Sequence, residues 1–187
     1  NKVFANAQTG NVVLMSQNFM LGEWKRGIHY LIPVLAFAAG VFFAEQIGYR
    51  LKEYKRLHWR QIVILFEMVL LGIVGFLPFR YNMLANVLVS FSCAMQVQAF
   101  RKVNGYGYAS TMCIGNLRSG TESISVYLRS KDRKDLRKAF HYYGIIFVFA
   151  IGAGAGGIVA KIIGFPAIWC SCGLLLICFG LMCREHL

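Results

Sequence analysis

The feature that most constrains this chain is a series of five long apolar runs. Each run is 17 to 23 residues long and carries few charges. An α-helix crosses the hydrocarbon core of a bilayer with roughly 20 apolar residues. We therefore expect an all-α integral membrane protein. The expected crossings cover residues 28–48, 61–77, 84–100, 141–163 and 167–183.

The composition supports this class and excludes several others. Hydrophobic residues make up 57% of the 187 residues, charged residues only 15%, and the mean hydropathy is +0.53. Soluble domains are typically about 45–50% apolar and about 25% charged. A soluble enzyme, a disordered protein and a disulfide scaffold are therefore excluded, and the six cysteines act as small hydrophobic residues. We expect residues 1–187 to form a single transmembrane domain.

The basic residues predict the orientation in the membrane. The net charge is +12, and two clusters of Lys and Arg lie at residues 50–60 and 129–138, between apolar runs. Lys and Arg are enriched in the cytoplasmic loops of membrane proteins, so both clusters should be cytoplasmic. Attraction to anionic lipids accounts for the remaining positive charge. Membrane lipids are thus expected partners, and nucleic acid is not.

Two shorter segments, residues 9–22 and 115–128, are too short and too polar to cross. Helices over residues 12–22 and 117–128 would be only ~16 to 18 Å long at 1.5 Å per residue. We expect each segment to be a re-entrant half-helix, which begins near mid-membrane and returns to the same side. Counting basic residues on each side favours re-entry over full crossing.

These two segments belong to an internal repeat. Thr9-Gly10-Asn11 corresponds to Ile114-Gly115-Asn116, and each segment is followed by an apolar run that opens with a His-Tyr pair. By the charge assignment, the His-Tyr run of the first unit crosses from outside to inside, and that of the second unit crosses from inside to outside. This predicts an inverted repeat of three transmembrane helices plus one half-helix per unit.

The two repeats cover about residues 1–78 and 84–183. The second contains the run 84–100 ahead of its half-helix, whereas only eight residues precede Thr9. We therefore expect the first helix of the first repeat to be missing from this chain.

Three stretches also resemble a known family. They are residues 4–11 (Phe-Ala-Asn-Ala-Gln-Thr-Gly-Asn), residues 95–98 (Met-Gln-Val-Gln) and residues 115–117 (Gly-Asn-Leu). Together they resemble the YoaK-type bacterial transmembrane proteins, a family classed as a domain of unknown function. The resemblance implies a multi-pass protein of the bacterial inner membrane and supplies no activity or catalytic residues. Ile114 stands where the family usually has Thr.

The half-helix starts are the candidate binding site. Unpaired backbone N–H groups and the positive end of the helix dipole favour an anion or a carboxylate there. The residues expected to line this site are Thr9, Gly10, Asn11, Gly115 and Asn116. The alternative is that these residues only cap and pack two short helices.

Charged and amide residues extend the candidate site. Arg118, four residues before Glu122, either attracts the anion or forms an ion pair with Glu122. Gln96 and Gln98 lie on nearly opposite faces of their helix, so one of them can reach a central site while the other bonds to a neighbouring helix.

Two acidic residues lie inside the apolar runs. Glu67 is about two turns into its run, where it either carries a proton during transport or stays neutral in a bond between helices. Glu45 lies near a basic end and is interpreted as an interfacial charge.

The sequence contains no pattern typical of catalysis, of a metal site or of a cofactor site. The glycine-rich residues 152–157 lie within an apolar run and indicate close helix packing rather than a nucleotide loop. We expect a transporter or channel for a small, anionic solute, assembled as a homo-oligomer with contacts at Gly40, Gly152 and Gly156. The alternative is a membrane scaffold, a lipid-binding protein or a partner subunit without transport. A cavity lined by Thr9, Asn11, Asn116 and Glu67 would favour transport.

Overall fold

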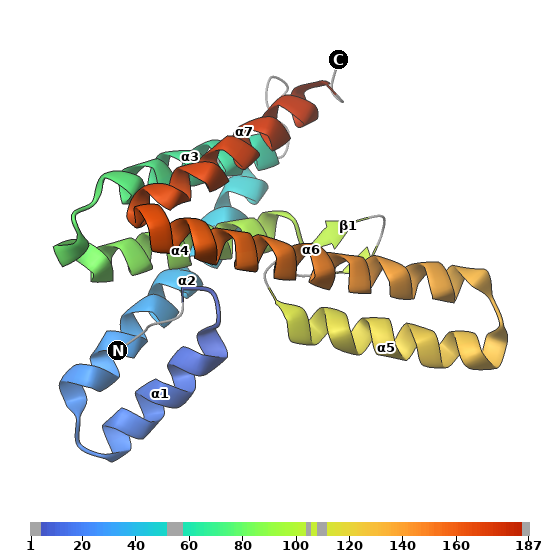
Figure 1. The fold of residues 1–187 in the computed structure, drawn as a ribbon, viewed down its shortest axis with the longest axis horizontal. Helices are drawn as coiled ribbons and strands as arrows, with labels where there is room; N and C mark the ends of the chain where they lie inside the picture. The colour runs from blue at the N-terminus through green and yellow to red at the C-terminus, as the bar shows by residue number, and fades with distance from the viewer. Residues whose placement is uncertain (1–4, 52–57, 104–105, 108–111, 185–187) are drawn as a thin grey trace. The chain divides into compact units, whose positions relative to one another are not determined.

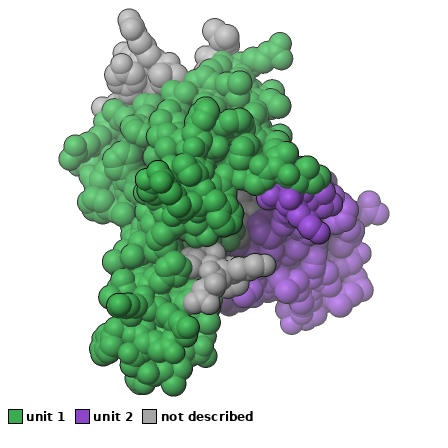
Figure 2. Space-filling model, turned by 60° about the vertical axis from the view of Figure 1, so that its left-hand side comes forward, with its two compact units in different colours: residues 1–99, 162–187 green, residues 100–161 purple. Residues whose placement is uncertain are grey.

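The computed structural model describes residues 5–51, 58–103, 106–107 and 112–184. These residues are almost entirely helical, with one pair of two-residue strands (Figure 1). The chain divides into two compact units, coloured separately in Figure 2. The first comprises residues 1–99 and 162–187, and the second comprises residues 100–161.

The first unit is a helical bundle organised around a central helix. The helix α4 packs against both α2 and α3, α7 packs against α3, and α1 forms a hairpin with α2 (Figure 1). The elements of this unit are α1 (Gln8–Met20), α2 (Trp24–Leu51), α3 (Trp59–Phe76), η1 (Phe79–Tyr81), α4 (Asn82–Ala99), η2 (Phe165–Ala167) and α7 (Ile168–Arg184).

Glycines allow two close contacts between elements of this unit. A Cβ atom on Gly40 of α2 would lie 2.4 Å from the carbonyl oxygen of Phe91 on α4. A Cβ atom on Gly75 of α3 would lie 2.0 Å from Nε1 of Trp169 on α7. Small residues allow such close approach between apolar helices. Gly40 is therefore used inside the protein, and its predicted role as an oligomer contact is wrong.

The second unit contains a short strand pair and a helical hairpin. Strands β1 (Lys102–Val103) and β2 (Tyr106–Gly107) pair in antiparallel fashion. Helices α5 (Cys113–Ser130) and α6 (Arg133–Ile163) lie side by side (Figure 1). The hydroxyl groups of Thr121 and Tyr143 are 2.8 Å apart, and the Tyr142 hydroxyl donates to the Gly107 carbonyl.

All five predicted apolar runs are helices, which confirms the all-α fold class. Within the described residues, four helices are long and apolar enough to cross a membrane: α2, α3, α6 and the stretch Phe165–Arg184 that contains α7. The helix α4 is not among them, although the sequence predicts a crossing there. It carries buried Ser90 and Ser92 and packs in the centre of its bundle.

The two short segments are also helical, but with different lengths. The 13 residues of α1 span ~20 Å, less than the ~30 Å hydrocarbon core. The 18 residues of α5 span ~27 Å, more than the sequence predicts, because the helix begins at Cys113 and ends at Ser130. The short length of α1 is compatible with a half-helix, and re-entry remains a prediction for both segments.

The basic clusters are not simple loops. The helix α6 begins at Arg133, eight residues before the predicted start, and takes in most of the second cluster. The reason is a local N-terminal capping bond, in which the backbone N–H of Lys134 donates to Oδ1 of Asp132 at 2.8 Å. Of the first cluster, residues 52–57 lie outside the described residues.

Candidate functional site

The start of α1 is tied to two other helices by a buried chain of hydrogen bonds. Asn11, which is fully buried, donates through Nδ2 to Oε1 of Gln8 at 2.9 Å. Gln8 then donates through Nε2 to Oγ of Ser90 on α4, also at 2.9 Å. The Ser90 hydroxyl donates in turn to the carbonyl of Pro33 on α2, at 2.8 Å. This polar chain joins α1, α4 and α2.

The start of α5 shows the same placement of its asparagine. Asn116 is the fourth residue of α5, as Asn11 is the fourth residue of α1, and both are buried. Asn116 donates through Nδ2 to the carbonyl of Met112 at 3.1 Å. Neither helix has a side-chain cap at its N-terminus. Both asparagines are therefore buried at the same position of their helices, although their hydrogen-bond acceptors differ.

The other predicted site residues at these helix starts are less enclosed. Thr9, Gly115 and Arg118 are exposed, and Gly10 is half-buried. No ion pair joins Arg118 to Glu122 within the described residues, so the self-contained pair is not formed. Thr9 to Asn11 belong to the first unit and Gly115 to Arg118 to the second. A site shared by the two helix starts remains a prediction.

A cavity of about 330 Å³ lies inside the first unit, between α3, α4 and α7. None of Thr9, Gly10 or Asn11 lines it, whereas Glu67 and Gln96 both do. The described residues that line it are Glu67 and Leu71 from α3, Val89, Ser92, Cys93 and Gln96 from α4, and Ile168, Ser171, Leu174, Leu175 and Cys178 from α7.

Two residues that line this cavity each carry a buried oxygen atom with no hydrogen-bond partner among the described residues. These atoms are Oε1 of Glu67 and Oγ of Ser92, and both side chains are almost completely buried, at 2% and 3% exposure. A buried polar group without a partner typically destabilises a fold by about 1–3 kcal/mol. Acidic groups deep in apolar helices are rare and mark pathways or binding sites. The cavity is thus the strongest candidate site in the first unit.

Sequence reasoning placed Glu67 and Gln96 in the site but missed the rest of the cavity. The missed polar residues are Ser92, Cys93 and Ser171. A signal was present, because the α4 members lie at positions 89, 92, 93 and 96, which is the spacing of one helix face.

A contact with Glu45 shows which of the two glutamines bonds to a neighbouring helix. Nε2 of Gln98 on α4 donates to Oε2 of Glu45 on α2, and Gln98 lies outside the cavity lining. The prediction that one of the two glutamines bonds to a neighbouring helix is therefore confirmed, and Glu45 is exposed.

The described residues contain no group of three or more His, Cys, Asp or Glu side chains placed to hold a metal ion. The chemistry that the cavity lining offers is hydrogen bonding through carboxyl, hydroxyl and amide groups.

The fold defines the class: a multi-helix protein whose long apolar helices are compatible with embedding in a membrane. The chain belongs to the family described as "Protein of unknown function (DUF1275)", which matches residues 1–181. The resemblance found in the sequence, to an uncharacterised family of membrane proteins, agrees with this match at the family level. Neither a curated protein nor a solved structure matches the chain.

Proposed function

We propose that this protein is a membrane transporter or channel for a small solute, which binds in the cavity between α3, α4 and α7. The observation that carries the proposal is that two residues lining one cavity, Glu67 and Ser92, each have a buried side-chain oxygen without a hydrogen-bond partner among the described residues. A solute that donates hydrogen bonds would supply the partners that these atoms lack.

The lining favours a particular solute chemistry at this cavity. Glu67, Ser92 and Gln96 all offer oxygen acceptors, and no basic side chain is found among the described residues of the lining. An amine or a hydroxyl compound matches these acceptors better than an anion does. Proton exchange at Glu67 would allow coupling to the proton gradient. The anionic solute predicted from the sequence belongs to the helix starts, where it remains a separate proposal.

Several finer features are part of the proposal. We propose that α1 and α5 are the half-helices of an inverted repeat, which the equivalent buried positions of Asn11 and Asn116 support. We also propose a homo-oligomer in the bacterial inner membrane, with the basic clusters on the cytoplasmic side, which transports its solute without chemical conversion. Gly152 and Gly156 remain candidate oligomer contacts, because no described atom lies within 4 Å of a Cβ built on either.

The rival function is a scaffold without transport. The polar chain from Asn11 through Gln8 and Ser90 to Pro33 favours it for the start of α1, because these groups bond to one another and hold three helices together. The Gly10-Asn11 pair is then a structural element. This alternative leaves the cavity at Glu67 unexplained.

The test is uptake of labelled solutes, together with the accompanying proton flux, in liposomes that contain the full chain and a trapped pH-sensitive dye. The panel contains amines, polyols, amino acids and inorganic anions. Glu67→Gln keeps the size of the side chain but removes its titratable proton. The matched control is Glu45→Gln, which makes the same change at an exposed position outside the cavity.

We expect Glu67→Gln to reduce the flux at least tenfold, while Glu45→Gln retains it. Both variants should elute like the wild-type protein on size exclusion in detergent. Equal flux in wild type and Glu67→Gln would contradict the role of the cavity. A folded wild-type protein without flux for any member of the panel would favour the scaffold.

A further inference from the structure

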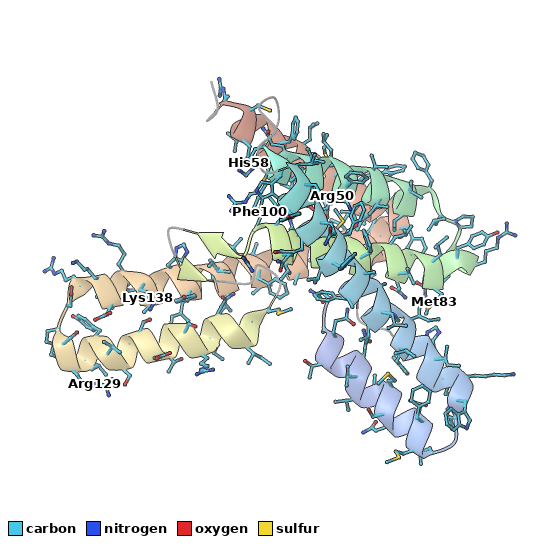
Figure 3. All side chains as sticks on the ribbon, turned by 180° about the vertical axis from the view of Figure 1, so that it is seen from behind. Arg50, His58, Met83, Phe100, Arg129 and Lys138 are labelled. Carbon is cyan, nitrogen blue, oxygen red and sulfur yellow. The ribbon has the colours of Figure 1, made fainter. Side chains whose placement is uncertain are left out.

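The end of the α5–α6 hairpin is the most basic part of the described chain. Two acidic residues lie among its basic residues, and both accept hydrogen bonds locally. Asp132 accepts from the backbone of Lys134, and Asp135 accepts from the hydroxyl of Ser130. Arg129 and Lys138 mark this end of the hairpin in Figure 3. Its basic residues are Arg129, Lys131, Arg133, Lys134, Arg137 and Lys138.

A pocket of about 460 Å³ opens at this end, between the last turns of α5 and the first turns of α6. Its lining is Tyr127, Arg133, Leu136, Arg137 and Phe140. Arg133 and Arg137 are one helical turn apart, so both guanidinium groups are on the same face of α6. Neither arginine forms an ion pair with a described residue. The pocket therefore combines two uncompensated positive charges with an apolar and aromatic wall.

The order of these residues along α6 matches the order of groups in a phospholipid. The arginines come first, Phe140 follows with 70% of its surface exposed, and the apolar, membrane-length part of α6 comes next. Arginine binds phosphate oxygens through two parallel hydrogen bonds. An exposed phenylalanine at the start of an apolar helix contacts the upper part of an acyl chain.

We propose that this pocket binds one anionic phospholipid. Its phosphate lies between Arg133 and Arg137, and its glycerol and first acyl carbons contact Leu136 and Phe140. A free inorganic phosphate would leave this apolar wall unused. Basic clusters next to membrane helices attract anionic lipids in general, but here the two lining arginines bind a single molecule.

The experiment compares two double variants of the full chain in detergent, each losing two positive charges from the same hairpin. Arg133→Gln with Arg137→Gln removes the charges that line the pocket. The matched control, Arg129→Gln with Lys134→Gln, removes charges outside the lining. Native mass spectrometry measures bound phosphatidylglycerol, with phosphatidylcholine of the same acyl chains and inorganic phosphate as the other probes.

We expect the wild-type protein to retain phosphatidylglycerol in preference to phosphatidylcholine. The lining variant should bind it about tenfold more weakly, and the control less than about twofold more weakly. Arg137→Lys keeps the charge but lacks the planar fork of arginine, so it should weaken binding severalfold, which provides a second test if the double variant does not fold.

Three results would overturn the proposal. An equal loss in both double variants would mean that only the overall positive charge attracts the lipid. Equal retention of phosphatidylcholine would remove the role of the anionic headgroup. Displacement of phosphatidylglycerol by inorganic phosphate at equal concentration would identify a free anion, rather than a lipid, as the ligand.

Discussion

The close contact between α2 and α4 gives the most quantitative prediction, for the substitution Gly40→Ala. The added Cβ would lie 2.4 Å from the Phe91 carbonyl oxygen and 2.8 Å from the Cβ of Ala94. Neither atom can move by a change of rotamer, so α4 itself must shift. Overpacking of this kind typically costs about 1–3 kcal/mol. The better helix propensity of alanine offsets about 0.5–1 kcal/mol of this. The difference is a net loss of up to about 2.5 kcal/mol, with a central value of about 1 kcal/mol.

The control for Gly40→Ala is Gly72→Ala, on α3. No described atom lies within 4 Å of a Cβ built at Gly72, so this change should be neutral or stabilise the protein by about 0.5–1 kcal/mol. For a chain of this size, 1 kcal/mol corresponds to roughly 2–4 °C in the melting temperature. The Gly40 variant should therefore melt roughly 5 °C below the Gly72 variant.

The assay heats both Gly→Ala variants in detergent and measures the fraction that still elutes in the folded peak on size exclusion. Equal midpoints for the two variants would refute the close approach of α2 and α4. A Gly40 variant more stable than wild type would refute it more strongly.

Two further predictions concern the ends of the short helices. Lys131 follows α5 with a φ of 57°, a conformation that favours glycine, so Lys131→Gly should raise stability by about 0.5–1 kcal/mol. Lys134→Gly, at a helical position in the first turn of α6, should bring no such gain, and equal midpoints for the two variants in the same melting assay would contradict this account. Asn11→Ala removes the donor to Gln8 and should destabilise by about 1–3 kcal/mol, whereas Gln17→Ala, at an exposed position of α1, should have little effect. Similar melting of the Asn11 and Gln17 variants would show that the polar chain adds no stability.

The sequence was sufficient to predict where helices form, because an apolar run of membrane length has few other stable conformations. It was less informative about where they begin. The start of α6 at Arg133 depends on a single hydrogen bond to Asp132, which an apolar pattern does not report. The centre of the bundle was also difficult to predict, since α4 is enclosed by α2 and α3 and tolerates Ser90 and Ser92 there.

The candidate site was predicted in pieces. Glu67 was recognised because a carboxyl group is costly in an apolar helix, and Gln96 because it lies near the end of its run. Glu67 and Gln96 line one cavity together with Ser171. This depends on the register between three helices that are distant in sequence. The side chain of Asn11 is held by Gln8, and an apolar pattern does not identify this hydrogen-bond partner. Local patterns thus identified polar residues in apolar helices but did not identify their neighbours.

The two polar faces of α4 connect the start of α1 to the cavity between α3, α4 and α7. Ser90 and Ser92 are two residues apart, so their side chains point in nearly opposite directions, one to Gln8 and Pro33 and the other to the cavity. A rigid helix cannot turn one face without turning the other. Any rotation of α4 that reshapes the cavity around a solute must therefore strain or break the bonds that hold the start of α1. A shift of α4 at the cavity is in this way coupled to the hydrogen bonds that anchor the start of α1.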